Sequence, residues 1–139
     1  MAVDFGDGDQ QLLDRALQMA QKFGSQVWVL YVAAPEPDFV GYEVGPQYVR
    51  DFRAEDLRTE HKSLAAYAEY LSKAGVAAEG LLIQGQTVET ILQEAVKLKT
   101  DLFVVGTHKH GFLYRFLNTN APFELAKKTD IPLLIVPLD

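Results

Sequence analysis

The chain has 139 residues, of which 48% are hydrophobic and 23% are charged, and its net charge is −6. This length is typical of one domain with a full apolar core, and we expect a single domain over residues 1–139. The absence of cysteine excludes a disulfide scaffold, a thiolate zinc site and a cysteine nucleophile. Nucleic-acid binding is disfavoured, because it depends on basic side chains that neutralise phosphates and no basic stripe is visible. No apolar run approaches the roughly 20 residues that span a bilayer, and no signal-peptide pattern is visible, so we expect a cytoplasmic protein.

The chain opens with a short strand and an amphipathic helix. Residues 2–5 are predicted to form a strand stub, which is shorter than the roughly 5–6 residues usual for a strand. Either this strand is unusually short or the sequence begins inside a longer one. A turn of glycine and aspartate follows, in which Asp7 or Asp9 can cap a helix from about residue 10 to Phe23.

A buried strand, a long loop and a long helix come next. Residues 27–32 are apolar and mostly β-branched or aromatic, which predicts a buried strand with Trp28 in the core. The stretch 33–47 is rich in proline and glycine and is predicted to be a loop. The helix predicted at 48–74 carries an apolar stripe at heptad-like spacing. His61 falls in this stripe, so we expect it to be half-buried and without a ligand role.

The second half of the chain continues the alternation of strands and helices. A strand is predicted at 77–83, a helix with Thr87 as its N-cap, a strand at 102–105 and a helix that ends near Thr129. Apolar strands that alternate with helices predict an α/β fold of three layers, in which a parallel sheet is covered by helices on both faces.

The last predicted strand, at 131–138, is strongly apolar and contains two prolines. Proline cannot donate to a strand ladder, so this strand belongs at an edge of the sheet. An apolar edge invites pairing with another chain. We therefore expect a homodimer joined through this strand, with the contact near Leu133, Ile135 and Val136.

The stretch from Asp101 to Asn120 is the best candidate for a ligand site. An apolar run ends at Gly106, a polar turn from Thr107 to Gly111 follows, and the segment beyond becomes helical. Open α/β sheets bind ligands where a strand ends in a loop that feeds a helix, and backbone N–H groups at a helix start suit phosphate. A plain connecting turn is the alternative.

Signatures of catalysis are absent from the sequence. It contains neither a phosphate-binding P-loop nor a nucleophile elbow. His108 and His110 lie at alternate positions, but no cysteine or adjacent carboxylate completes a metal set. We predict no catalytic residues and no metal site. The cationic turn is better explained as solvated or as an anion contact.

Five stretches carry a resemblance to a known family, and they lie at residues 2–17, 29–32, 85–95, 101–111 and 123–137. The most specific are DLFVVGTHKHG and FELAKKTDIPLLIVP at the end. Over essentially its full length, the chain resembles the universal stress protein (UspA) family. The resemblance implies a Rossmann-like, adenine nucleotide alpha hydrolase-like fold with five parallel strands in the order 3-2-1-4-5. Family members usually dimerise through the fifth strand, which would cover the apolar edge.

One branch of this family binds ATP through the motif G-x2-G-x9-G-[ST] after the fourth strand. Here its positions hold Gly106, Lys109, Thr119 and Asn120, so the spacing is kept but two of the three glycines are replaced. Those glycines let the backbone approach the triphosphate. The chain therefore lies nearer the branch that does not bind ATP. The resemblance also implies a base and ribose site formed by Asp4, Val32, Val105 and Gly106.

These observations predict a homodimer with a binding or regulatory role in stress response and without catalysis. The alternative is an ATP- or AMP-binding sensor, in which Lys109 and His110 supply charge in place of glycine N–H groups. A slow nucleotide hydrolase on the same scaffold is the third hypothesis. Neither nucleic acid nor a membrane is an expected partner.

Overall fold

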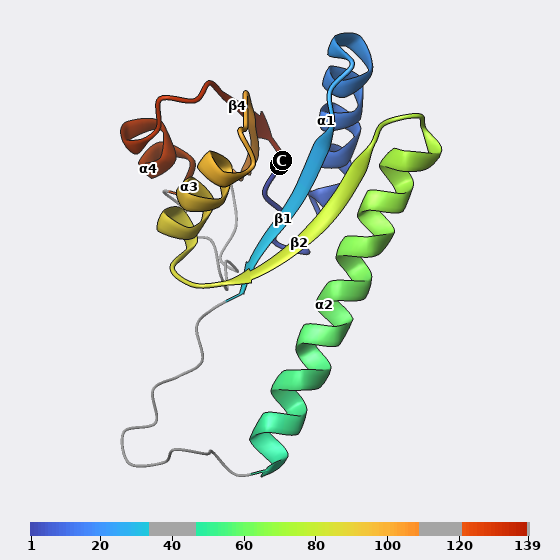
Figure 1. The fold of residues 1–139 in the computed structure, drawn as a ribbon, viewed down its shortest axis with the longest axis vertical. Coiled ribbons are helices and arrows are strands. Elements are labelled where there is room, and N and C mark those ends of the chain that lie inside the picture. The colour runs from blue at the N-terminus through green and yellow to red at the C-terminus, as the bar shows by residue number, and fades with distance from the viewer. Residues whose placement is uncertain (34–46, 109–120, 139) are drawn as a thin grey trace.

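The computed structural model describes residues 1–33, 47–108 and 121–138 and contains alternating helices and strands (Figure 1). In chain order these are α1 (Asp9–Phe23), β1 (Val27–Ala33), α2 (Gln47–Lys73), β2 (Ala78–Gln84), α3 (Thr87–Lys97), β3 (Phe103–Thr107), α4 (Ala121–Lys128) and β4 (Leu133–Pro137). The predicted alternation of strands and helices after residue 8 is confirmed. None of these helices, as far as the structure describes them, is long and apolar enough to cross a bilayer.

The strands form two parallel pairs. β1 pairs with β2, starting with Val27 opposite Ala78, and β3 pairs with β4, starting with Phe103 opposite Leu133. The predicted α/β class with parallel strands is confirmed. Within the described residues, the structure shows two two-stranded sheets in place of one continuous sheet.

The first residues of the chain lie between the two pairs. Ala2 forms an isolated parallel bridge with Leu30. The Val3 N–H donates to the Leu30 carbonyl at 2.9 Å, and the Ala2 N–H donates to the Val104 carbonyl on β3 at 3.1 Å. The short strand predicted at residues 2–5 is therefore reduced to one isolated bridge at Ala2, and the backbone of Ala2 and Val3 contacts both strand pairs.

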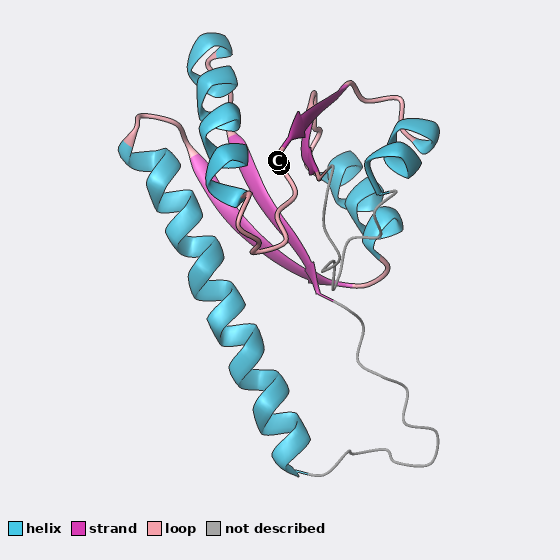
Figure 2. Ribbon diagram, turned by 180° about the vertical axis from the view of Figure 1, so that it is seen from behind, coloured by secondary structure: helices cyan, strands magenta, loops and turns pink. Residues whose placement is uncertain are grey.

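Helices cover both faces of the strands, as predicted. α1 and α2 pack on one face, whereas α3 and α4 pack on the other (Figures 1 and 2). Each face has its own apolar cluster. The α1–α2 side includes the fully buried Leu12, Leu13, Leu64 and Leu71, and the α3–α4 side includes Val88, Ile91, Phe103 and Leu125.

The buried face of α2 differs from the predicted stripe. His61 is exposed and does not lie on the apolar face. The residues that turn inward follow the spacing of 3 and 4 that keeps side chains on one side of a helix. They are Leu57, Glu60, Leu64, Tyr67 and Leu71.

Three other local predictions are also wrong. Trp28 is half-buried and does not lie in the closed core, because it borders a cavity. The N-cap of α1 is Gly8, without a side-chain cap, and Asp9 is buried as the first helical residue. The N-cap of α3 is Gln86, and Thr87 is the first residue of that helix.

β4 has the proline placement of an edge strand. Successive N–H groups in a strand point to opposite sides. The Leu138 N–H donates to the Thr107 carbonyl on β3 at 2.9 Å, so the nitrogen of Pro137, one residue earlier, faces away from β3. The proline therefore removes no hydrogen bond from the β3–β4 ladder.

Candidate functional site

A cavity lies at the carboxyl end of β3, where this strand meets the N-terminal segment, α1 and α4. Its polar lining comes mainly from Asp4, Asp9, Thr107 and His108, and its apolar lining includes Val105, Ala121, Pro122 and Leu138. The described residues enclose about 40 Å³ there. This is the strand-to-helix position at which open α/β sheets bind ligands.

Asp9 carries a buried carboxyl group that borders this cavity, and only 3% of its surface is exposed. The Tyr67 hydroxyl donates to Asp9 Oδ2 at 3.0 Å from α2. Burial raises the pKa of Asp9 to about 6, and the negative charge of Asp4 adds to the rise, whereas the hydrogen bond from Tyr67 opposes it. Burial also raises the pKa of Tyr67, so its hydroxyl stays protonated and remains a donor. A perturbed carboxyl in a cavity is typical of a functional site.

The turn before α1 holds Asp4 at the edge of the cavity. The Gly6 N–H donates to Asp4 Oδ1 at 2.8 Å, and the Asp9 N–H donates to the Gly6 carbonyl at 3.1 Å. Between them Phe5 adopts a left-handed backbone with φ of 60°. Its ring packs on Tyr31, with ring centroids 4.4 Å apart. Backbone in this conformation is sparsely populated and is held in place by packing, and here it lies between Asp4 and Gly6, directly after a residue that borders the cavity.

Leu138 forms a wall of the cavity by packing between two glycines. A Cβ at Gly8 would lie 2.7 Å from Leu138 Cδ1, and a Cβ at Gly106 would collide with the same side chain. Both glycines therefore make room for Leu138. Gly106, which the sequence suggests as the first glycine of a nucleotide motif, has a packing role in this structure.

The structure brings together three of the residues that the sequence assigns to the base and ribose. Asp4, Val105 and Gly106 border the same cavity. Val32 is buried and borders a smaller neighbouring cavity, which it shares with Asp4 and Ala2. Asp4 therefore borders both cavities.

The other predicted site residues cannot be placed. Lys109, Thr119 and Asn120, the phosphate positions of the expected motif, lie outside the described residues. In the described part of the chain, no cluster of three or more histidine, aspartate or glutamate side chains could hold a metal ion.

Sequence reasoning missed Asp9 as a member of the site. The helical repeat indicates its burial, because Asp9 precedes the buried Leu13, Ala16 and Ala20 by 4, 7 and 11 residues on the same face of α1. Thr107 and His108 lie in the polar turn that the sequence singles out. The contribution of Pro122 was not foreseen.

Comparison with known proteins identifies relatives along the whole chain. The sequence profile of the universal stress protein family matches residues 1–137. A Thermus aquaticus protein, described as the universal stress protein in the QAH/OAS sulfhydrylase 3′ region, is 30% identical over 139 residues. The alignment covers 98% of this chain and 95% of that relative.

Solved structures share the fold at lower identity. A universal stress protein in complex with cAMP has a TM-score of 0.73 and 19% identity, and the match covers 100% of this chain and 95% of that one. The universal stress protein from Archaeoglobus fulgidus in complex with dAMP has a TM-score of 0.67 and 19% identity, with coverage of 97% and 93%. These likenesses support a Rossmann-like α/β fold with parallel strands.

Proposed function

Because the chain belongs to the universal stress protein family, we propose that it binds an adenine nucleoside or nucleoside monophosphate and acts as a binding protein without catalysis. The observation that carries this proposal is the cavity at the end of β3. Asp4, Val105 and Gly106, which the family resemblance assigns to base and ribose, meet there. Two proteins of the same fold were solved with cAMP and dAMP, which supports this ligand class.

The chemistry of the cavity suits such a ligand. The Asp4 carboxylate can accept hydrogen bonds from an adenine amino group or from ribose hydroxyls. The Val105 side chain offers an apolar wall for a purine ring. Ala121 and Pro122, the first two residues of α4, also border the cavity. The amino end of a helix favours an anion, so one phosphate group is accommodated there.

A triphosphate suits the same site less well. Lys109 and Thr119 replace glycines where backbone would meet phosphate, and each added Cβ occupies space or disfavours a positive φ. Asp4 and Asp9 place two carboxyl groups at the cavity, and their charge opposes the extra negative charge of ATP. We therefore propose that adenosine or AMP is preferred over ATP.

Calorimetric titration with adenosine, AMP and ATP tests the proposal. We expect AMP to bind and ATP to bind at least about tenfold more weakly, which corresponds to about 1.4 kcal/mol. Asp4→Asn should weaken AMP binding by a similar factor. Asp7→Asn is the matched control, since Asp7 lies exposed on the same turn and does not border the cavity. An equal loss in both variants, or no AMP binding by the parent, would refute the proposal.

Restoring the motif tests the role of the missing glycines. The triple variant Lys109→Gly, Thr119→Gly and Asn120→Ser should bind ATP at least about tenfold more tightly than the parent, while its AMP affinity changes little. The measurement is again calorimetry. Micromolar ATP binding by the parent that is lost in Lys109→Ala would favour the nucleotide-sensor hypothesis instead.

We further propose that the two parallel pairs belong to one five-stranded sheet of order 3-2-1-4-5. The hydrogen bonds of Ala2 and Val3 to both β1 and β3 support this arrangement. The proposed homodimer then joins the free edge of β4 to its copy. The outward nitrogen of Pro137 and the half-buried Leu133 and Ile135 are compatible with a covered edge.

A further inference from the structure

The Asp9 side chain lies in the lining of the cavity at the end of β3, although α1 does not use it as a cap. The N-cap of α1 is Gly8, and Asp9 is the first residue of the helix. A carboxylate removed from water lowers the stability of a fold unless hydrogen-bond donors compensate for the lost hydration. A buried carboxyl beside a ligand cavity therefore points to a role in binding.

Hydrogen-bond donors hold the Asp9 carboxyl at the cavity from two sides. From α2, the Tyr67 hydroxyl donates to Asp9 Oδ2 at 3.0 Å. From the segment before α1, the backbone N–H groups of Asp4 and Phe5 donate to the same carboxyl and lower its pKa. A carboxyl oxygen remains an acceptor when the group is protonated, so the Asp9 carboxyl keeps its position in both protonation states.

One other carboxyl and one imidazole border this cavity among the described residues. Asp4 carries the carboxyl, and its negative charge raises the pKa of Asp9. His108, directly after β3, carries the imidazole. From β1, the Tyr31 hydroxyl donates to Glu60 Oε1 on α2 at 3.3 Å, and neither of these residues borders the cavity. α4 and the segment after β4 contribute uncharged side chains to the lining, and these are Ala121, Pro122, Leu125 and Leu138.

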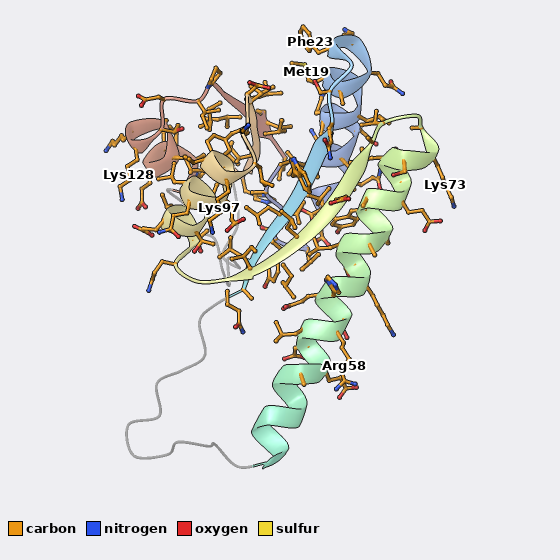
Figure 3. All side chains as sticks on the ribbon, in the orientation of Figure 1. Met19, Phe23, Arg58, Lys73, Lys97 and Lys128 are labelled. Carbon is orange, nitrogen blue, oxygen red and sulfur yellow. The ribbon has the colours of Figure 1, made fainter. Side chains whose placement is uncertain are left out.

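In the part of the chain that the structure describes, no lysine or arginine borders this cavity. Figure 3 labels four of these side chains, with Arg58 and Lys73 on α2, Lys97 on α3 and Lys128 on α4. The three lysines form ion pairs with glutamates on the helices. Like charges repel most where water is partly excluded, so an anion in the cavity meets two carboxyl groups without a described lysine or arginine beside it.

The next inference rests on the nucleotide binding proposed above. We propose that Asp9 is a specificity-determining residue of that site, whose protonation state sets the preference of the cavity between an anionic adenine nucleotide and the neutral nucleoside. Protonation removes one negative charge from the lining and adds one O–H donor to it. An anionic nucleotide therefore binds together with a proton that Asp9 takes from the solvent. Adenosine carries no charge, so it binds both forms of Asp9 alike.

The direction of the pH dependence follows from linkage. In the free protein, burial raises the pKa of Asp9 to about 6. A bound anion favours the protonated carboxyl and raises this pKa further, and the same factor separates the anion affinities of the two protonation states. The affinity for an anionic nucleotide is therefore full below about pH 6, and it falls as the pH rises through the higher pKa of the complex.

An NMR titration of the Asp9 carboxyl carbon in the free protein and in two complexes tests the proposal. The probes are adenosine and cAMP, because cAMP keeps one negative charge over this range, whereas the phosphate of AMP itself titrates near about pH 6. We expect protonated Asp9 to bind cAMP at least about fourfold more tightly than charged Asp9 does. Saturating cAMP then raises the pKa of Asp9 by at least about 0.6, and adenosine leaves it unchanged.

The two ligands separate failure of this inference from failure of the proposed function. Absence of binding by both ligands at every pH would refute nucleotide binding, and the role of Asp9 with it. If adenosine binds but cAMP does not bind at pH 5.5, the nucleoside site stands and the role of Asp9 is refuted. The same conclusion follows if both ligands bind and cAMP leaves the pKa of Asp9 unchanged or lowers it.

A neutral residue at position 9 should remove the selection by charge. Asp9→Asn keeps the size of the side chain and the acceptor for Tyr67, so calorimetry should show equal cAMP affinity at pH 5.5 and pH 8, whereas the parent binds at least about threefold more tightly at pH 5.5. Asp7→Asn, exposed on the same turn, should keep the ratio of the parent. A ratio that persists in Asp9→Asn and disappears in His108→Gln would assign the pH dependence to the histidine and overturn the proposal.

Removal of the Tyr67 hydroxyl should move the pH profile without abolishing it. The hydrogen bond from Tyr67 lowers the pKa of Asp9, so Tyr67→Phe should shift the midpoint of the cAMP profile to higher pH. Tyr70→Phe is the matched control, because the Tyr70 hydroxyl lies exposed on the same helix and donates to Asp14 at 2.6 Å. A midpoint that stays in place in Tyr67→Phe, or that moves equally in both variants, would mean that Asp9 does not set the profile.

Discussion

At the residue scale, the Asp9 carboxyl borders the candidate site, and its burial lowers the stability of the fold when the group is charged. The folded pKa of about 6 lies above the value of 3.8 for a free aspartate, so the folded state binds its proton more tightly than the unfolded state does. This group therefore favours folding most below about pH 4. Its contribution is lost as the pH rises to about 6, and above that the buried charge destabilises the fold.

The variant Asp9→Asn should remove this pH dependence. The amide oxygen can still accept from the Tyr67 hydroxyl, while the buried charge is absent. We expect the variant to be more stable than the parent by about 2–3 kcal/mol at pH 7.5 and about equally stable at pH 4. Urea unfolding at both pH values measures this. Asp7→Asn, at an exposed position, should show no such change. A stability difference that does not vary with pH would mean that the pKa of Asp9 is the same in the folded and unfolded states.

Gly106 tests the packing around Leu138. Gly106→Ala should lower the free energy of unfolding by about 1–3 kcal/mol, because its Cβ would displace the Leu138 side chain. In a double-mutant cycle with Leu138→Ala, which removes the colliding atoms, the two losses should sum to more than the loss in the double variant. Additive losses would mean that Gly106 is needed for another reason.

At the element scale, β3 carries the core of the α3–α4 side and one wall of the candidate site. Phe103, its first residue, is 6% exposed, as the sequence predicts. Phe103→Ala should lower the free energy of unfolding by about 3–5 kcal/mol, through lost transfer energy and the cavity left behind. Val96→Ala is an exposed control. A loss for Phe103→Ala below about 1 kcal/mol in urea unfolding would mean that β3 is not a core strand.

The helices and strands were predictable because their apolar periods are local properties of the sequence. The features that were predicted wrongly depend on contacts between residues that are far apart in the sequence. The burial of Asp9 rests on Tyr67, 58 residues later, and a local reading of an aspartate before a helix favours a cap. The side of α2 that faces the strands includes Glu60 and Tyr67 as well as leucines. These two polar side chains interrupt the apolar pattern, so the sequence prediction placed His61 on that side instead.

The candidate site was predictable in part. Asp4, Val105 and Gly106 were foreseen from the family resemblance, and the structure brings them to one cavity. Leu138 comes to the same cavity from the opposite end of the chain, and no spacing within the sequence predicts that contact. Trp28 was expected in the core, but the cavity between β1 and β3 leaves it half-buried.

At the scale of the whole molecule, the first residues of the chain bond to both parallel pairs, and we propose the outer edge of β4 as the contact with a second copy. We predict that the parent sediments as a dimer at tens of micromolar. Ile135→Arg should shift it to monomer without unfolding, because Ile135 is half-buried. Val136 is 5% exposed in the single chain and belongs to the core, so Val136→Arg should unfold the protein instead. A parent that sediments as a monomer at this concentration would refute the proposed dimer.

Amide chemical-shift mapping with AMP tests our proposal that the cavity at the end of β3 binds an adenine nucleoside or its monophosphate. We expect AMP to shift the amide signals of Asp4, Gly106 and Thr107 in a saturable manner, while those of Trp28 and Val96, which do not border this cavity, stay in place. Absence of shifts at millimolar AMP, or shifts confined to residues outside the cavity, would contradict it.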